Sequence, residues 1–136
     1  MPAGPKYPWK AAAPAPKMET LRFPPADQVS VSIVDDQILG LDFLPGGNLG
    51  LYKKGAQEYK LFLVKLGDYV APANALLEYK NRMPDAKLVA TFGGYAGTDR
   101  GQPAFVFTKG HYLLGIVGLT PEKADPVARI FAGRVN

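Results

Sequence analysis

Residues 58–66 read EYKLFLVKL, and this stretch decides the fold. Successive side chains of a strand point to opposite faces, so alternate positions share a side. One side carries Tyr59, Leu61 and Leu63, and the other carries Lys60, Phe62 and Val64. Because both sides are apolar in the middle, the pattern predicts a central strand, covered by a helix on one face and by another layer on the other.

Shorter strand patterns precede this stretch. Residues 28–34 alternate apolar and serine side chains, which predicts a strand with one buried face. Asp35 and Asp36 then predict a turn. Residues 38–44 are expected to form a second strand, which ends in the turn-forming cluster at residues 45–48. A short third strand is expected over residues 49–52.

The C-terminal half combines helix signals with further strands. Pro72 suits a first helical turn, and apolar residues recur near helical spacing until Pro84. Thr120 and Pro121 suit the start of a last helix, whose apolar stripe is expected at Val127, Ile130, Phe131 and Val135. The expected elements are a helix over 72–83, a strand over 88–92, a glycine-rich loop over 93–101, a hairpin of 104–108 with 112–119, and the last helix.

The order of these elements predicts an α+β fold. Strands and helices do not alternate regularly, and the strand connections have hairpin length. We therefore expect a mainly antiparallel sheet that packs two helices, one mid-chain and one C-terminal, on one face. A β-sandwich with added helices is the alternative.

Residues 1–27 are expected to form an extended, proline-rich and basic arm in front of a single α+β domain over residues 28–136. The first seventeen residues carry five prolines and three lysines and no acidic residue. Proline fixes φ and lacks a backbone donor, so this stretch cannot fold alone as a helix or an interior strand. Because Tyr7 and Trp9 are large aromatic residues, we expect the arm to lie on a partner.

Composition excludes several function classes. The 136 residues have a net charge of +4, of which Lys6, Lys10 and Lys17 supply three charges, so the body is nearly neutral. Strong DNA binders neutralise roughly 6 to 10 phosphates, which disfavours nucleic acid as a partner. The chain has no cysteine and no apolar run of roughly 20 residues, so thiol chemistry and a transmembrane segment are not expected. A poor match to a secretory signal favours a cytoplasmic location if Met1 is native.

No motif predicts a catalytic, metal or cofactor site, and we expect a protein that is not an enzyme. His111 is the only histidine and is expected in a plain turn beside Gly110. Asp35, Asp36 and Asp42 lack the spacing of a calcium-binding loop. Residues 93–101 are rich in glycine but lead into a strand instead of the helix that a phosphate-binding loop requires. They are expected to form a long hairpin loop that carries any function of the body.

Part of the chain resembles an uncharacterised bacterial domain family of unknown function. The resemblance rests on Gly67-Asp68-Tyr69, on Pro72-Ala73-Asn74-Ala75, on the glycine-rich turn, and on residues 105–112, which read FVFTKGHY before a closing helix. It covers residues 58–135 and implies the same α+β arrangement. It transfers no site residues.

These observations favour a non-enzymatic accessory subunit that docks onto a larger protein assembly, with the surface of a membrane-bound complex as one setting. A flexible arm adds contact area when it orders on a partner. The expected partner-binding residues are Lys6, Tyr7, Trp9, Lys10 and Lys17 in the arm and Tyr95 and Arg100 in the glycine-rich loop. The alternative is a small-ligand-binding domain with an enclosed pocket between sheet and helix.

Overall fold

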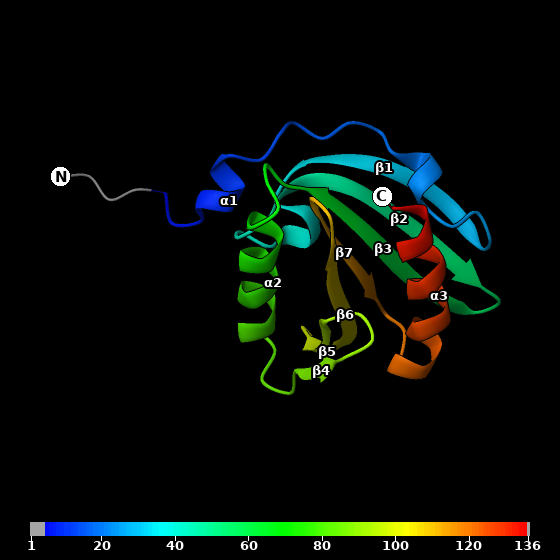
Figure 1. Cartoon of the computed structure of the whole chain (residues 1–136). Coiled ribbons are helices and arrows are strands. Elements are labelled where there is room, and N and C mark those ends of the chain that lie inside the picture. The colour runs from blue at the N-terminus through cyan, green and yellow to red at the C-terminus, as the bar shows by residue number, and fades with distance from the viewer. Residues whose placement is uncertain (1–4, 136) are drawn as a thin grey trace.

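The computed structural model describes residues 5–135, which fold around one antiparallel sheet of seven strands (Figure 1). The strand order is β1-β2-β3-β7-β6-β5-β4, and every neighbouring pair is antiparallel. The strands are β1 (Gln28–Asp36), β2 (Pro45–Lys54), β3 (Gln57–Lys65), β4 (Lys87–Val89), β5 (Gly94–Asp99), β6 (Gln102–Lys109) and β7 (Tyr112–Val117). The α-helices are α1 (Pro8–Ala11), α2 (Ala71–Asn81) and α3 (Pro121–Arg134), and the 3-10 turns are η1 (Thr20–Arg22) and η2 (Ile38–Gly40). The α+β class is confirmed.

The central position predicted for residues 58–66 is confirmed, but the helices do not share one face of the sheet. β3 lies between β2 and β7. Leu61 and Leu63 belong to the core that α3 covers, whereas Phe62 and Val64 belong to the core that α2 covers. Figure 1 shows α2 and α3 on opposite sides of the curved sheet. The one-face prediction is wrong because both faces of β3, β6 and β7 are apolar and each requires a cover.

α2 covers its face of the sheet through an aromatic stack. The Tyr79 ring lies parallel to the Phe62 ring at a centroid distance of 6.1 Å and meets the Phe43 ring edge-on at 5.6 Å. The helix starts one residue before the predicted position, and the Asp68 carboxylate accepts hydrogen bonds from the backbone N–H groups of Val70 and Ala71 there, at 2.9 and 2.7 Å. These bonds hold the pKa of Asp68 below its ordinary value.

α3 covers the other face, and three of the four residues of the predicted stripe face the core. Ala124, Ala128 and Phe131 are fully buried, whereas Ile130 is 55% exposed. Small alanine side chains let the helix approach the large aromatic residues that β6 contributes to the same core. Phe131 and Val135 of the predicted stripe are fully buried and Val127 packs against the same core, so the prediction is wrong only for Ile130.

Residues 38–44 do not form the expected strand. Residues 38–40 form η2, and β2 begins at Pro45, inside the cluster that was expected to be a turn. A Cβ atom on Gly46 would collide with the backbone carbonyls of Val34 and Asp35 on the neighbouring strand. The glycine there permits a close approach between strands, which local sequence does not distinguish from a turn.

The glycine-rich stretch 93–101 is mostly strand rather than loop. Residues 94–99 form β5, and only Arg100 and Gly101 turn the chain into β6. A Cβ atom on Gly94 would collide with the Val106 carbonyl, so this glycine again serves close strand packing. The expected strand over residues 88–92 shortens to the three residues of β4. The hairpin that joins β6 to β7 is confirmed.

Residues 5–27 do not extend away from the sheet, and we call them the N-terminal strap. α1 lies beside α2, the chain then crosses the ends of the strands, and η1 reaches α3 (Figure 1). This short α1 helix makes three helices rather than the expected two. The expected extended arm is therefore not confirmed over the described residues. Residues 1–4, with Pro2, lie outside them.

Contacts anchor the strap at three places. The Trp9 indole N–H donates to the Phe43 carbonyl at 2.9 Å. The buried Asn48 side chain donates to the Lys17 carbonyl at 2.7 Å and accepts from the Glu19 N–H at 2.9 Å. The fully buried Phe23 ring packs on Phe131 of α3 at a centroid distance of 5.3 Å. The strap thus contacts the cores on both faces of the sheet.

Candidate functional site

The aromatic residues that the sequence predicted as partner anchors contact their own chain. Tyr7 and Trp9 are half-buried, and their ring centroids lie 5.4 Å apart. Tyr7 also meets the Phe43 ring edge-on at 6.3 Å. These rings pack against the core that α2 covers. The prediction that they bind a partner gains no support from this placement.

The three lysines of the strap have different surroundings. Lys10 donates to the Asp42 carbonyl at 2.9 Å, and its ammonium lies 3.6 Å from the exposed Asp36 carboxylate. The Lys6 ammonium lies 5.3 Å above the Tyr7 ring. Lys17 is exposed. The structure therefore spreads these charges along the strap.

Tyr95 and Arg100 lie on the same hairpin but in different surroundings. Tyr95 is half-buried in β5, and the Lys80 ammonium of α2 lies 5.4 Å from its ring centroid. Arg100 lies at the turn, where its Nη1 donates to the Leu39 carbonyl at 2.8 Å. Of the two, only Arg100 lines one of the surface hollows described below.

The first surface that the fold leaves open is the outer edge of β1. This nine-residue strand pairs with β2 alone within the described chain, and none of its residues is fully buried. Val29 is 65% exposed and Ile33 is 38% exposed. Its outer backbone N–H and C=O groups have no strand partner among residues 5–135. An edge of this length is a template for another strand.

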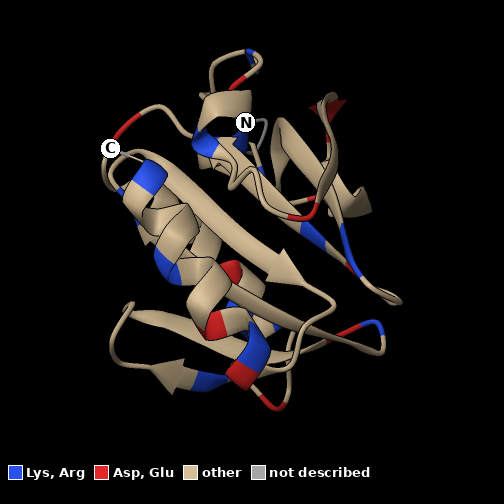
Figure 2. Ribbon diagram, turned by 90° about the vertical axis from the view of Figure 1, so that its right-hand side faces the viewer, with Lys and Arg blue, Asp and Glu red and all other residues tan. Residues whose placement is uncertain are grey.

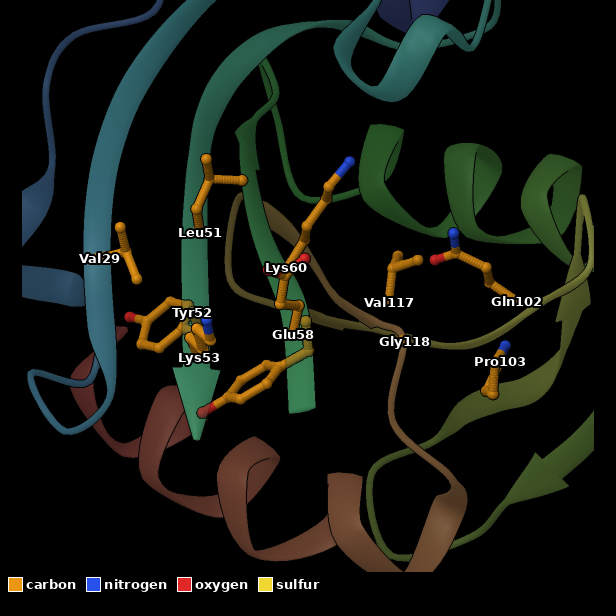
Figure 3. A pocket seen from close by; sticks show the side chains of 11 residues that line it. Val29, Leu51, Tyr52, Lys53, Glu58, Lys60, Gln102, Pro103, Val117 and Gly118 are labelled. Atoms are coloured by element: carbon orange, nitrogen blue, oxygen red, sulfur yellow. The ribbon is translucent and has the colours of Figure 1, made fainter. Parts of the chain in front are cut away.

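The second open surface is a trough beside β1. It lies on the face of the sheet that α2 covers, at the end of that face which the helix does not reach. It consists of two adjoining hollows, of about 600 and 340 Å³, which share Lys60, Gln102 and Val117. Figure 3 shows Leu51, Lys60 and Val117 pointing to the same side of the sheet, with Tyr52 pointing the other way. The remaining lining residues are Val29, Leu39, Leu49, Tyr52, Lys53, Glu58, Tyr59, Asp99, Arg100, Pro103 and Gly118.

Register explains why these side chains share the trough. Leu51 on β2 is opposite Lys60 on β3, and Lys60 is opposite Val117 on β7. Residues directly opposite each other in an antiparallel pair point to the same face. The row therefore places one lysine between two apolar side chains, on a central strand.

The charges of the trough do not balance. Lys53 and Glu58 are opposite each other in register. Lys60, by contrast, has no ion pair among the described residues. The buried Asp99 carboxylate accepts a hydrogen bond from Arg82 Nε at 2.8 Å on one oxygen and from Arg100 Nε at 3.1 Å on the other. Since one carboxylate neutralises one guanidinium, the trough keeps an excess of positive charge.

Backbone strain gathers at the rim of the trough. Leu39 has φ of 59° and Arg100 has φ of 50°, and the Arg100 side chain connects the two. Gln37, two residues before Leu39, has φ of 49°. Residues other than glycine rarely adopt this left-handed region, which costs of order 1–3 kcal/mol per residue. The fold holds η2 and the β5–β6 turn together at this cost.

A buried hydroxyl lies behind this rim. Tyr79 is fully buried, and its hydroxyl has no hydrogen-bond partner among the described residues. Burial raises the pKa of Tyr79 most, the Asp99 charge raises it further, and the charges of Arg100 and Arg82 lower it. The hydroxyl therefore lies within electrostatic range of the Arg82–Asp99–Arg100 cluster.

Sequence reasoning missed most of the trough. From the sequence, Lys60 was placed on one face of a central strand and was assigned no binding role. A lysine flanked by apolar residues on such a strand could have indicated one. Asp99 was noted only as part of the glycine-rich stretch, and its pairing with Arg82 gave no signal, because the two are 17 positions apart and meet only through the fold. The openness of β1 also depends on strand order.

The remaining candidates add no second site. Within residues 5–135, no group of three His, Asp or Glu side chains could hold a metal ion. Asp35 and Asp36 are the last residues of β1 instead of forming a turn. His111 lies between β6 and β7, as predicted, against the Tyr69 ring at a centroid distance of 4.0 Å. No helix of the described chain has the length and apolar character to cross a membrane.

Comparison with known proteins returns no relative: no family model matches the chain, and neither the curated proteins nor the solved structures contain a significant match. The resemblance to an uncharacterised bacterial family stays a prediction.

Proposed function

We propose that this protein is a non-enzymatic accessory subunit that docks onto a larger assembly by accepting a strand of a partner protein at the β1 edge. The observation that carries the proposal is the long, unpaired and partly apolar outer edge of β1. Added strands obtain affinity from main-chain hydrogen bonds and specificity from alternate side chains.

The two ends of the sheet support this choice by their difference. The opposite edge strand, β4, has three residues, which is one of the ways in which proteins protect a sheet edge. β1 has nine residues, no proline and no lysine. Its protection is confined to its two ends, an irregular register between Gln28 and Ser30 and the charged Asp35 and Asp36. The remaining length is suited to pairing.

The filled core favours docking over an enclosed ligand pocket between sheet and helix. Between α2 and the sheet lie the fully buried rings of Phe62 and Tyr79, with Phe43 beside them. The same residues that would line a pocket there are packed against each other, as in an ordinary protein interior.

Charge suggests the chemistry of the partner strand. Asp27 precedes β1, and Asp35 and Asp36 end it. Opposite charges on neighbouring strands stabilise pairing, whereas like charges destabilise it. The partner strand is therefore expected to carry apolar side chains beside Val29 and Ile33 and a lysine or arginine near Asp35. On the side drawn in Figure 2, positive and negative residues are interspersed along the ribbon. The expectation that the assembly is membrane-bound stays a prediction.

Site-specific photocrosslinking tests the proposal. Benzoylphenylalanine is placed at the exposed Ser32 of β1 and, as a matched control, at the exposed Asn74 of α2, in cells that make the protein. We expect one discrete adduct from position 32 that position 74 does not give. The adduct is expected to disappear when Val29→Lys and Ile33→Lys are added, because inserted lysines block edge pairing.

Hydrogen exchange of the purified complex completes the test. Backbone amides of β1 are expected to exchange more slowly when the partner is bound, while those of β4 do not change. Equal adducts from both positions, adducts that survive the lysine substitutions, or unchanged β1 amides would refute strand addition. An adduct between two copies of this chain would refute it in favour of self-association.

A further inference from the structure

The trough is an independent site, whose apolar row, excess cations and size together point to a ligand. We propose that it binds a small amphipathic anion, with a carboxylate or phosphate head between Lys60 and Arg100 and an apolar body along Leu51 and Val117. This inference does not depend on strand addition at β1, because Leu51, Lys60, Val117 and Arg100 lie outside β1, and of the β1 residues only Val29 borders the trough.

The apolar part of the site follows the sheet. Leu51 and Val117 flank Lys60 in register, and Leu39 and Leu49 line the adjoining hollow. Leu51 is 38% exposed, although it lies on the second strand of a seven-stranded sheet. An apolar body laid along this row would remove these side chains from water, at about 25 cal/mol per Å² of apolar area buried.

The cationic part has donors that the fold leaves unused. The Lys60 ammonium has no hydrogen bond or ion pair among the described residues. Arg100 uses Nε for Asp99 and Nη1 for the Leu39 carbonyl, and its Nη2 has no hydrogen-bond partner in the described chain. Both residues line the same hollow. The fork of a guanidinium and a nearby ammonium suit a carboxylate or phosphate.

The position of Arg100 is fixed before any ligand arrives. Its bond to the Leu39 carbonyl joins two segments that are 61 residues apart, and both residues have left-handed backbone conformations. A donor held in place loses less conformational entropy on binding. The volume of the two hollows falls within the range of about 300–1,000 Å³ for small-molecule sites.

Calorimetric titration of the purified chain with four probes tests the chemistry. Decanoate and decyl phosphate carry both an anionic head and an apolar body, 1-decanol lacks the charge, and inorganic phosphate lacks the body. We expect at least one of the two anionic amphiphiles to bind at least tenfold more tightly than 1-decanol and than inorganic phosphate. The tighter of the two identifies the head as a carboxylate or a phosphate.

Three exposed substitutions locate the site, because they change charge without disturbing the core. Lys60→Met is expected to weaken binding up to about fivefold, which is the upper end of the range for an exposed ion pair. Lys65→Met is the matched control: it lies on the same strand, on the other face of the sheet, and should leave binding unchanged. Glu58→Gln removes a negative charge from the trough and is expected to strengthen binding about twofold.

Several results would overturn the inference. Equal affinity for 1-decanol and decanoate would remove the role of the cations, and equal affinity for inorganic and decyl phosphate would remove the role of the apolar row. Equal weakening by Lys60→Met and Lys65→Met would mean that net charge and not the trough attracts the anion. No measurable binding of either amphiphile would refute the site. None of these results bears on the crosslinking at β1.

Discussion

The N-terminal strap and β1 each differ from what their sequences suggest: the strap was expected to contact a partner, and β1 was expected to be an ordinary strand of the sheet. The strap has no regular structure over most of its length, yet Trp9, Asn48 and Phe23 fix it to both faces of its own sheet. β1 has a regular strand pattern, yet its outer backbone groups have no strand partner in the described chain. Irregular backbone is therefore a poor guide to a surface that seeks a partner. The docking proposal therefore rests on the position of β1 in the sheet.

The largest expected effect is on stability, and it tests whether the strap is anchored to the sheet. Phe23→Ala removes a fully buried ring from its contact with Phe131 and is expected to lower the free energy of unfolding by about 3 kcal/mol. Urea denaturation followed by circular dichroism measures this. A loss below about 0.5 kcal/mol would mean that the strap contributes little to the fold, and the comparison with β1 would fail.

Trp9→Ala tests the other end of the strap. It removes a half-buried ring and the indole hydrogen bond to Phe43, and we expect a loss of about 2 kcal/mol in the same denaturation assay. Trp9→Phe keeps an aromatic ring but no donor, so about 1 kcal/mol should be lost. Identical losses for the two variants would assign the whole effect to the hydrogen bond.

The strap also makes stability depend on alkaline pH. The Tyr112 hydroxyl donates to the Glu19 carboxylate at 2.6 Å. Burial is the larger cause and this hydrogen bond the second, and together they raise the pKa of Tyr112 to about 12. The unfolded value is about 10. The resulting stabilisation is complete below about pH 10 and is lost as pH rises toward 12, because the folded state holds the proton more tightly.

Unfolding free energies measured between pH 8 and 12 check this pH dependence. Above pH 10, the free energy of unfolding of the Tyr112→Phe variant is expected to fall less steeply with pH than that of the unaltered protein. The free energy of unfolding should still fall for both proteins, because burial also raises the pKa of Tyr52, Tyr59 and Tyr79. Identical slopes would show that folding does not raise the pKa of Tyr112.

The smallest expected effect on stability belongs to β1. Val29→Lys and Ile33→Lys change exposed side chains and should each alter the free energy of unfolding by no more than about 0.5 kcal/mol. The same two changes are expected to abolish the adduct at Ser32. Thermal denaturation provides the control. A loss above about 2 kcal/mol would mean that these side chains are part of the core, and the contrast with the strap would disappear.

Local sequence was sufficient where a residue's role depends on its near neighbours. The two apolar sides of residues 58–66 predicted a central strand, and Pro72 and Thr120 marked the starts of α2 and α3 within a residue or two. It was insufficient at Gly46 and Gly94, where the glycine accommodates a neighbouring backbone. A turn and a close approach between strands require the same residue type.

The sequence by itself determined the α+β class, the central strand and the absence of cysteine chemistry, because periodicity and composition are properties of the chain alone. Only the tertiary structure decided that the helices cover opposite faces, that the strap folds back, that β1 is an open edge, and that Lys60, Asp99 and Arg100 line one trough. The physical reason is that these features depend on which distant segments pair. That choice is made by the burial of the whole core and not by any local preference.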